Sequence, residues 1–531
     1  MKKGNLRVLL VYSTLYNKTG LPIGLASICS VLQNGGHKAK IFDTAFYNLS
    51  GKEHSAKVRA ERLMSKKITD EERYFPKKNN VFADLSNIIS NFKPDIVGIS
   101  TLESAYEISL KLAEYIRNNF RDIKIVVGGV FPTMSPEIVI REKSIDIVCV
   151  GEGEIPFLEL CNKIADKKEI TGISGLWIKD KGEIVRNKPC KLHDLNSLPH
   201  PSFNKFEEAL FYKPMQGRLY KMVNIATSRG CPYQCTYCAA PKLKEIFKDN
   251  SCGRYYRKID MNRVIDQIHY QIDNHKPEFI YFSSETFLSM TDSEFEIFIE
   301  QYDKIRLPFW FQTRFETITK ERLEKLKYVG MYWLTIGLEH GNEEFRAKVL
   351  KRKYSNAIAI EKIKILSELN IGASINNMMG FPSENRDLIF DTISLNKQLW
   401  EINNKMEFNI FLFAPFRGCE LYDLCLEKGL LQAGSIMNDT DMAMESVLAF
   451  PDSFKKELRG LLKTFNLYVK LPEEYYPQIK IAEKDDTEGR LIFEQLGNLL
   501  KNAVDKSPPS SIKSIRYHRH DIKNSLTDTA R

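Results

Sequence analysis

The sequence predicts an α/β protein in which a doubly wound parallel sheet is followed by a partial (βα)6 barrel and a small helical C-terminal region. Three observations support this prediction. Short apolar runs rich in β-branched residues alternate with helical stretches over residues 1–200, the alternation resumes over 216–425, and amphipathic helical spacing dominates 426–505. The chain has 531 residues, enough for about two to four domains.

The first domain, residues 1–200, is expected to be a Rossmann-like parallel sheet whose ligands bind at the carboxyl ends of the strands. A helical stretch over 20–32 follows the first strand, charged residues between 49 and 82 are interpreted as a surface helical insertion, and proline-punctuated residues 195–201 fit a linker. The predicted strands are 6–12, 38–43, 94–100, 123–129 and 145–150. Small or hydroxylated residues at their carboxyl ends leave room for a large flat ligand: Thr14, Ser100, Thr101, Gly128, Gly129, Gly151 and Gly153.

The second domain, residues 216–425, continues the alternation of strands and helices. Its predicted strands are 221–227, 279–282, 309–314, 332–339, 372–380 and 407–413. Six βα units are too few for a complete eight-unit barrel, so the sequence predicts a partial barrel with an open side. The functional groups of parallel barrels gather at the carboxyl ends of the strands, where Arg314 is one candidate to face a carboxylate.

The C-terminal part, residues 426–505, is predicted to form amphipathic helices over 454–469 and 488–503, with a break at 475–477. We expect these helices to cover the barrel mouth and to shape the choice of substrate. From 506 to 531, a Pro-Pro-Ser-Ser run and a polar basic stretch are typical of a disordered tail.

Three closely spaced cysteines follow the first strand of the second domain. Cys231, Cys235 and Cys238 have a C-x3-C-x2-C spacing, with which three thiolates can hold three irons of a 4Fe–4S cube and leave the fourth iron open. Gly230 and Pro232 suit the tight backbone of such a loop. Two other interpretations remain open. A zinc ion could use a fourth cysteine further along the chain, although structural zinc sites usually pair their ligands, and the three thiols could simply be core residues.

Composition argues against several other classes of protein. The formal net charge of +9 is spread along the chain, so a nucleic-acid partner is not expected. No apolar run has membrane-spanning length, and the N-terminus shows no signal peptide. Ten cysteines without secretion features indicate a reducing compartment, so a cytoplasmic location is expected. Six scattered cysteines are interpreted as packing residues: Cys29, Cys149, Cys161, Cys190, Cys419 and Cys425.

The cysteine loop, with Tyr237 before its last cysteine, resembles the signature of radical S-adenosylmethionine (SAM) enzymes. The resemblance implies that the three cysteines hold a 4Fe–4S cluster and that SAM binds its open iron through the amino and carboxylate groups. It further implies that an electron from the cluster cleaves SAM to methionine and a 5′-deoxyadenosyl radical, and that Tyr237 lies beside the adenine.

Four more SAM contacts are implied by the same resemblance. Glu285 follows the second strand of the barrel, Glu339 lies in Ile336-Gly-Leu-Glu-His-Gly341, and Gly380 and Glu384 bound the turn Gly380-Phe-Pro-Ser-Glu384. The chain departs from the family at Ser283-Ser284, where an Asp-Asp pair is common, and at His340, which takes a serine place. Arg257 resembles an arginine that often follows the cluster loop. Glu384 could instead cap a helix. Cys252 is a candidate for the fourth ligand of a zinc site and, alternatively, for a residue that faces the cleft.

The first domain is similar to the cobalamin-binding domain that precedes many radical SAM barrels. The similarity rests on Pro94-Asp-x-Val-Gly-x-Ser100, Val127-Gly-Gly-x-x-Pro-Thr133 and Gly151-Glu-Gly-Glu154. It implies that cobalamin binds at the seven carboxyl-end residues given above. No Asp-x-His-x-x-Gly motif is present and His37 is interpreted as a surface residue, so no protein histidine is expected below the cobalt. An empty or repurposed cleft is the alternative.

Together the resemblances imply a radical SAM enzyme that uses cobalamin to methylate an unactivated carbon, after the deoxyadenosyl radical has removed a hydrogen atom from it. A non-methylating cyclase or oxidoreductase remains open, as does a zinc-stabilised ligand-binding protein that is not an enzyme. A methylthiotransferase is disfavoured, because the N-terminal cysteines do not match a second cluster site. Expected partners are a small-molecule, lipid or peptide substrate and an external one-electron donor of flavodoxin or ferredoxin type.

Overall fold

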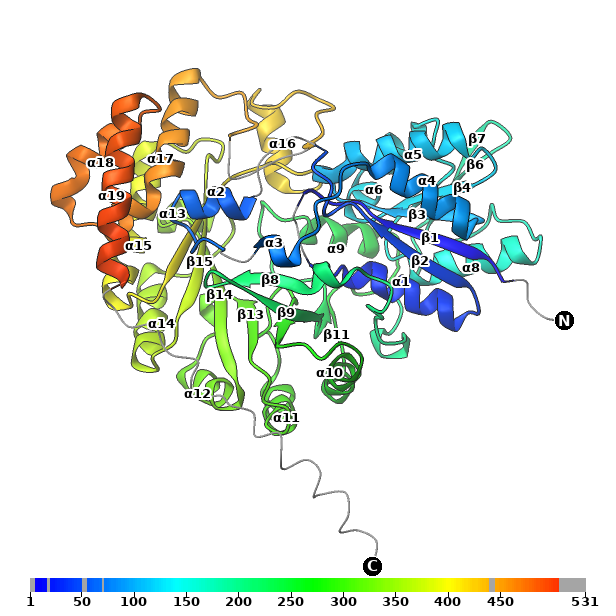
Figure 1. Cartoon of the computed structure of the whole chain (residues 1–531), viewed down its shortest axis with the longest axis horizontal. Helices are drawn as coiled ribbons and strands as arrows, with labels where there is room; N and C mark the ends of the chain where they lie inside the picture. Colours follow the sequence, from blue (N-terminus) through cyan, green and yellow to red (C-terminus); the bar gives the residue numbers. More distant parts are fainter. Residues whose placement is uncertain (1–4, 17–19, 50–54, 69–70, 439–444, 506–531) are drawn as a thin grey trace, which may run out of the picture.

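The computed structural model describes residues 5–16, 20–49, 55–68, 71–438 and 445–505. Figure 1 shows two α/β units side by side, an N-terminal sheet and a second, curved sheet, each with its own helices. A group of C-terminal helices lies at the far side of the second unit (Figure 1). No helix within these ranges is long and apolar enough to cross a membrane. The predicted tail, 506–531, lies outside the described residues.

The N-terminal sheet has seven strands in the order β2-β1-β3-β4-β5-β6-β7. Strands β1 to β5 pair in parallel, which confirms the predicted parallel sheet. The hairpin of β6 and β7 was missed; its strands are only partly buried and so lack a long apolar run. The strands are β1 Arg7–Tyr12, β2 Lys38–Asp43, β3 Ile96–Ser100, β4 Lys124–Gly128, β5 Ile147–Cys149, β6 Leu176–Asp180 and β7 Glu183–Arg186. The helices are α1 Ile23–Asn34, α2 Ser55–Glu61, α3 Glu71–Tyr74, α4 Val81–Phe92, α5 Tyr106–Asn119, α6 Val130–Met134, α7 Pro136–Arg141 and α8 Glu154–Ala165.

Hydrophobic cores cover both faces of this sheet, because successive side chains of a strand point to opposite faces. Val8 and Leu10 of β1 pack with α1 and α8 on one face, whereas Leu9 and Val11 pack with α4 and α5 on the other. The helix that follows β1 therefore packs on one face of the sheet, and the helix that follows β3 packs on the other face. The switch point of the strand order, where sheets of this type bind ligands, lies between these two strands.

The second sheet has seven strands in the order β16-β15-β14-β13-β12-β9-β8. Strands β9 and β12 to β16 pair in parallel, which confirms the predicted six-strand partial barrel. The antiparallel edge strand β8 was missed, because Pro214 in its centre argues against a strand. The strands are β8 Tyr212–Met215, β9 Arg218–Ile225, β12 Phe279–Phe282, β13 Phe309–Thr313, β14 Met331–Glu339, β15 Ala373–Met379 and β16 Glu407–Leu412; β10 Ser228–Arg229 and β11 Arg257–Lys258 form a separate ribbon. The helices are α9 Ala240–Asp249, α10 Met261–His275, α11 Asp292–Tyr302, α12 Lys320–Val329, α13 Glu343–Lys348, α14 Asn356–Glu368, α15 Arg386–Ile402 and α16 Glu420–Glu427.

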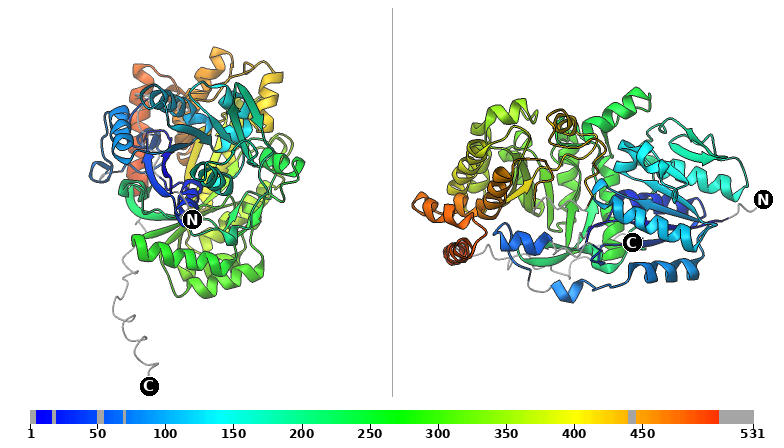
Figure 2. Two further views of the ribbon diagram at one scale, coloured as in Figure 1. Left: turned by 90° about the vertical axis from the view of Figure 1, so that its right-hand side faces the viewer. Right: turned by 90° about the horizontal axis from the view of Figure 1, so that it is seen from above.

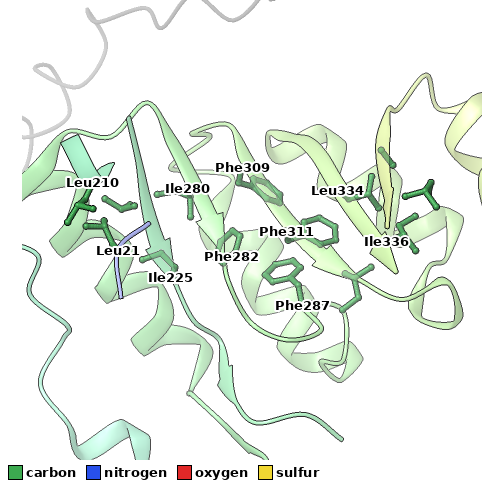
Figure 3. Close-up of a cluster of buried hydrophobic side chains, with 14 of the residues drawn as sticks. Leu21, Leu210, Ile225, Ile280, Phe282, Phe287, Phe309, Phe311, Leu334 and Ile336 are labelled. Carbon is green, nitrogen blue, oxygen red and sulfur yellow. The ribbon is translucent and has the colours of Figure 1, made fainter. Parts of the chain in front are cut away.

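The two faces of the curved sheet differ in character. The outer face is apolar and buried under the helices, as the phenylalanine cluster around Phe282, Phe309 and Phe311 in Figure 3 shows. The inner face carries aromatic and polar side chains that keep partial solvent contact, for example Trp310 of β13 and Asn376 of β15. The inner face is therefore the surface on which a substrate can lie.

The insertion predicted at 49–82 is helical, but it is not merely a surface feature. Its helices α2 and α3 lie against the second unit, away from the N-terminal sheet (Figures 1 and 2). Arg59 Nη2 donates to Asn409 Oδ1 of β16 at 2.6 Å, and the ring of Tyr74 lies 4.3 Å from that of Tyr212 on β8. The insertion thus touches both edge strands of the open barrel. The charged residues of the segment drew attention away from its buried apolar residues, which are Val58, Met64, Phe75 and Val81 among those described.

The C-terminal helices α17 (Asp452–Lys470), α18 (Tyr476–Ala482) and α19 (Thr487–Asp505) confirm the predicted helical region. They do not cover the barrel mouth as expected. Leu461 of α17 shares the outer core with Phe408 of β16, so α17 extends the outer layer of helices. The apolar outer face of this edge strand accounts for the difference, because it needs a covering helix.

Candidate active site

A two-stranded ribbon anchors the loop that carries the three cysteines. Strand β10 follows β9 after two residues and pairs antiparallel with β11. Gly230 comes next with a φ of +82°, and a Cβ at this position would lie 3.0 Å from the ring of Tyr255. Both the left-handed backbone and the close contact require glycine, which explains its place before the first cysteine.

Two polar groups contact sulfur atoms of the loop. Arg314 Nη1 donates to Cys235 Sγ at 3.3 Å, and the backbone N–H of Ala240 donates to Cys238 Sγ at 3.5 Å. Burial raises the pKa of the Cys238 thiol to about 12, and it also raises the pKa of Cys231. Metal binding must therefore release protons, after which the guanidinium and the N–H stabilise thiolate charge. This donor set fits a cluster held by thiolates.

Cys252 is part of a hydrophobic cluster and does not face the cleft. It is 4% exposed, packs with Leu243 and Phe247, and its Sγ donates to the carbonyl of Pro189 at 3.2 Å. Cys252 is thus engaged away from a fourth-ligand role. Among the described residues, no group of three or more histidine, cysteine or acidic side chains, the three loop cysteines included, is already arranged to hold a metal ion, so the assignment of these cysteines as cluster ligands stays a prediction. Five of the six scattered cysteines are buried as expected, and Cys190 is partly exposed.

Tyr237 and Glu339 both accept hydrogen bonds from one arginine, Arg352, which was not predicted from the sequence. Arg352 Nη1 donates to Tyr237 Oη at 2.9 Å and to Glu339 Oε1 at 3.3 Å, and its Nη2 donates to Gly337 O at 2.6 Å. Glu339 has a φ of +68° at a bulge that ends β14. Burial raises the pKa of Glu339 although Arg352 opposes the shift. The basic run Lys351-Arg-Lys353 was the only signal for Arg352 in the sequence.

Replacing Arg352 by methionine is expected to weaken SAM binding about tenfold or more, because Tyr237 and Glu339 lose their shared charged donor. Arg352→Lys keeps the charge but loses the planar fork, so its effect should be intermediate. The dissociation constant of SAM for the reconstituted protein measures the effect. Lys351→Met is the control, since the adjacent lysine pairs with Glu420 at the surface. Equal affinity in the Arg352 and Lys351 variants would contradict this role.

Glu384 stabilises the turn that begins at Gly380. Glu384 Oε1 is 2.9 Å from His340 Nε2, and its Oε2 accepts from Gly380 N and, at 3.0 Å, from Phe381 N. Because His340 Nδ1 accepts from Asn342 N at 3.0 Å, Nε2 carries the ring proton and donates to the carboxylate. The helix that follows is capped by Asn385, so Glu384 is not its cap. The predicted SAM contacts at this turn remain a prediction.

Glu285 faces a cavity of about 320 Å³ between the two units. The cavity is lined by residues of α1, the linker, β9, α10 and the segment after β12, and it reaches Gly230 of the cysteine loop. Glu285 is exposed to this cavity, and partial dehydration there raises its pKa. Two buried polar atoms of the lining have no partner among the described residues, Asn224 Oδ1 and Gln267 Nε2. The cavity thus offers unsatisfied polar groups and a carboxyl group to a ligand.

The carboxyl edge of the N-terminal sheet is more tightly packed than the sequence suggested. A Cβ on Gly129 would lie 2.3 Å from Thr101 O, one on Gly151 would lie 3.1 Å from the ring of Phe247, and one on Gly153 would lie 3.1 Å from Ile28. These glycines allow close packing of protein segments. Thr14 exchanges hydrogen bonds with Thr44, Thr101 N donates to Gly128 O at 3.0 Å, and Ser100 O accepts from Ser13 N.

Two exposed apolar side chains at this edge fit the face of a corrin ring. Leu102 directly follows Thr101 and is 56% exposed, and Val130 directly follows Gly129 and is 39% exposed. Exposed apolar side chains placed together at a ligand-binding edge mark a surface that another molecule covers. The residues present therefore fit a large flat ligand, although the apolar pair rather than the glycines provides the surface.

Replacing Leu102 by aspartate is expected to weaken cobalamin retention about tenfold or more, since burial of a leucine side chain contributes about 1.5–3 kcal/mol. The corrinoid absorbance left after anaerobic desalting measures retention. Leu491→Asp is the control, because Leu491 is 55% exposed on α19, away from both sheets. Unchanged retention in the Leu102 variant would show that cobalamin does not lie on this edge.

An ion-pair network joins the N-terminal sheet to the base of the cysteine loop. Arg229 of β10 lies 2.7 Å from Glu154 Oε1 and 3.1 Å from Glu152 Oε2, and Arg257 of β11 pairs with Glu152. The side chain of Glu154 is only 5% exposed. In the segment Gly151-Glu-Gly-Glu154, the two glutamates therefore make the contacts to the cysteine-loop ribbon, although the sequence pointed to the glycines. No signal in a single sequence pairs acids and arginines that are so far apart in the chain. We call these four side chains the interdomain clamp.

Two further expectations can be compared with the structure. The prediction that His37 lies at the surface is wrong, because His37 is 4% exposed and its Nδ1 accepts a hydrogen bond from Leu6 N at 3.2 Å. It lies at the start of β2, at the end of the sheet opposite to the ligand-binding edge. Arg314 does face a carboxylate, that of Glu316 at 2.7 Å, in addition to the sulfur of Cys235.

Comparison with known proteins agrees with this architecture. The model of the radical SAM superfamily matches residues 225–395, and the model of the B12 binding domain matches residues 11–161. An uncharacterized methyltransferase of Pyrococcus horikoshii is 25% identical over 92% of this chain and 93% of its own length. An anaerobic magnesium-protoporphyrin IX monomethyl ester cyclase of Synechocystis is 22% identical over 77% of this chain and 74% of its own.

Among solved structures, the radical SAM methyltransferase TsrM from Kitasatospora setae, with cobalamin and a 4Fe–4S cluster bound, superposes with a TM-score of 0.62. The superposition covers 94% of this chain and 100% of that chain at 14% identity, so it shows a shared fold. The B12-binding match runs from the end of β1 into α8 of the N-terminal unit, and the radical SAM match runs from the last residue of β9 into α15 of the barrel. The chain therefore belongs to the radical SAM enzymes that carry a B12-binding domain ahead of the barrel.

Proposed function

We propose that this protein is a cobalamin-dependent radical SAM enzyme that transfers a methyl group to an unactivated carbon. The observation that carries the proposal is the interdomain clamp, which fixes the ligand-binding edge of the B12-binding domain against the base of the cysteine loop. Two cofactor sites held against each other suit a reaction in which both cofactors act on one carbon atom.

The residues of this chain have distinct parts in the proposal. Cys231, Cys235 and Cys238 hold the cluster, and Arg314 stabilises the thiolate of Cys235. Tyr237, Glu339 and Arg352 form one hydrogen-bonded group beside the cysteine loop for the nucleoside part of SAM. Glu285 offers a carboxyl group for the amino group of SAM. Leu102 and Val130 support the flat face of cobalamin.

The bound groups supply the hard chemistry: the cluster with SAM removes a hydrogen atom from carbon, and cobalamin provides the methyl group. Reductive cleavage of SAM needs an electron, so an external one-electron donor of flavodoxin or ferredoxin type is part of the proposal. The substrate, a small molecule, lipid or peptide, lies on the inner face of the barrel. The protein positions it and excludes water and oxygen.

An anaerobic reconstitution with iron, sulfide and hydroxocobalamin tests the proposal. After desalting, we expect about four irons per chain, a corrinoid spectrum above the iron–sulfur band, and formation of 5′-deoxyadenosine when SAM and dithionite are added. SAM with a deuterated methyl group should then yield labelled methylcobalamin. Bound zinc without iron and sulfide would contradict the proposal and favour a ligand-binding protein.

The similarity to a cyclase favours one second candidate, a radical oxidation or ring closure without methyl transfer. The same reconstituted protein separates the two. Formation of 5′-deoxyadenosine without labelled methylcobalamin would favour the second candidate, whereas a labelled methyl group on cobalamin favours the first.

A further inference from the structure

Lys213 of β8 lies on the inner face of the barrel. It is paired in register with Tyr220 of β9, whose side chain belongs to the inner cluster together with Tyr281 and Trp310. Lys213 Nζ is 4.1 Å from the centre of the Tyr281 ring. A Cβ on Gly20 would lie 3.6 Å from Lys213 Nζ, so the loop after β1 of the N-terminal sheet packs against this ammonium group. Lys213 therefore stands where the B12-binding domain meets the barrel.

Among the described residues, Lys213 has no carboxylate partner and no hydrogen-bond acceptor. Lys221 on the neighbouring strand provides a contrast, because it lies on the outer face and pairs with Glu208 at 2.6 Å. Burial lowers the pKa of Lys213 to about 7. A partly buried cation without a counter-ion is unfavourable, so its presence indicates a functional role more often than a structural one.

The surroundings of Lys213 complete a site for a ligand with one charged end. The partly exposed rings of Tyr281 and Trp310 offer apolar contact along the inner face. Asn224 stands beside Tyr281 in the sheet register, is 7% exposed, and has an Oδ1 atom without a partner among the described residues. An anion would satisfy the lysine, and a ligand hydroxyl or amide could satisfy the asparagine oxygen.

We propose that the substrate carries an anionic group, a carboxylate or a phosphate, that binds Lys213 while the rest of the molecule packs on Tyr281 and Trp310. This inference rests on the proposed function, because it assigns the inner face of the barrel to the substrate. SAM has a carboxylate and cobalamin has a phosphodiester, so the source of the anion must be distinguished by experiment.

Competitive acetylation of the reconstituted holoprotein, followed by mass spectrometry, tests the proposal. Unprotonated amines react, so Lys213 should be acetylated faster than surface lysines. Phenyl phosphate and benzoate should slow the reaction at Lys213 about tenfold at saturation, whereas phenol, which lacks the anionic group, should not. In protein reconstituted with iron and sulfide only, protection of Lys213 by hydroxocobalamin alone or by SAM alone would overturn the proposal in favour of a cofactor contact. No protection by either anionic probe would also overturn it.

Variants separate this inference from the function itself. Lys213→Met should abolish the binding of phenyl phosphate by calorimetry but retain the cluster and the formation of 5′-deoxyadenosine from SAM. Lys221→Met is the matched control and should bind the probe as the wild type does. The Met variant is expected to fold, because it removes an unpaired charge and leaves no partner behind. If Lys213→Met and the wild type bind phenyl phosphate equally, the inference is contradicted. If the wild-type protein forms no 5′-deoxyadenosine from SAM, the proposed function is contradicted instead.

Discussion

Alanine at Cys231, Cys235 or Cys238 is expected to abolish cluster assembly and, with it, the reductive cleavage of SAM. In the proposed site each thiolate holds a different iron, so the loss of one leaves a second iron without a protein ligand. Substitution of groups that only support metal ligands typically lowers metal affinity or activity about 10–100-fold, and the loss of a ligand should exceed that. Iron and sulfide content after anaerobic reconstitution, together with the rate of 5′-deoxyadenosine formation, measures the effect.

Two other variants test whether the effect is specific to the three proposed cluster ligands. Cys252→Ala removes a buried thiol of the same domain and should keep full iron content, because Cys252 packs with Phe247 away from the loop. Arg314→Met should assemble a cluster with an altered electron paramagnetic resonance spectrum, since its guanidinium donates to Cys235 Sγ. Full iron and sulfide content in all three single alanine variants would show that these cysteines are not the ligands.

The fold could be predicted where a single physical pattern decides it. Buried parallel strands are continuous apolar runs, and the predicted parallel strands were therefore confirmed in both sheets. The edge hairpin β6–β7 and the edge strand β8 were missed, because edge strands are only half buried and tolerate residues such as Pro214. The insertion at 49–82 was misplaced for a related reason: its charged residues face solvent and hide the few apolar residues that dock it on the barrel.

The site could be predicted only as far as local motifs extend. The cysteine spacing, Tyr237 and Glu339 are local features, and the structure brings Tyr237 and Glu339 to one arginine. Arg352 itself and the clamp partner Arg229 had no motif, because their roles arise from contacts between segments far apart in the chain. The glycines at the carboxyl edge of the N-terminal sheet were predicted to leave room for a ligand, but protein atoms fill the space beside them. A glycine in a sequence does not reveal whether a ligand or the protein itself fills that space.

The second large effect is expected from the interdomain clamp. Glu154→Gln should lower the free energy of unfolding by up to about 3–5 kcal/mol, because it leaves the partly buried Arg229 of the cysteine-loop ribbon partly uncompensated. Burial alone would raise the pKa of Glu154, but Arg229 holds this pKa below its usual value. The contribution of this ion pair to the free energy of unfolding is therefore complete above about pH 5. It is lost as the pH falls through the pKa of Glu154 in the folded protein. Denaturant unfolding of wild type and variant at both ends of this range measures it.

A structural role alone would lower stability, but the clamp should also couple the two cofactor sites. Glu154→Gln is therefore expected to lower cobalamin retention and to change the electron paramagnetic resonance spectrum of the reduced cluster, while iron content stays complete. The double variant with Arg229→Gln should be less destabilised than the sum of the single variants, by about 0.5–3 kcal/mol for residues in direct contact. Lys348→Gln is the control, because its pair with Glu344 is exposed on both sides and should change neither readout. Additive single effects, with cobalamin retention unchanged, would mean that the two units are held together by packing rather than by these charges.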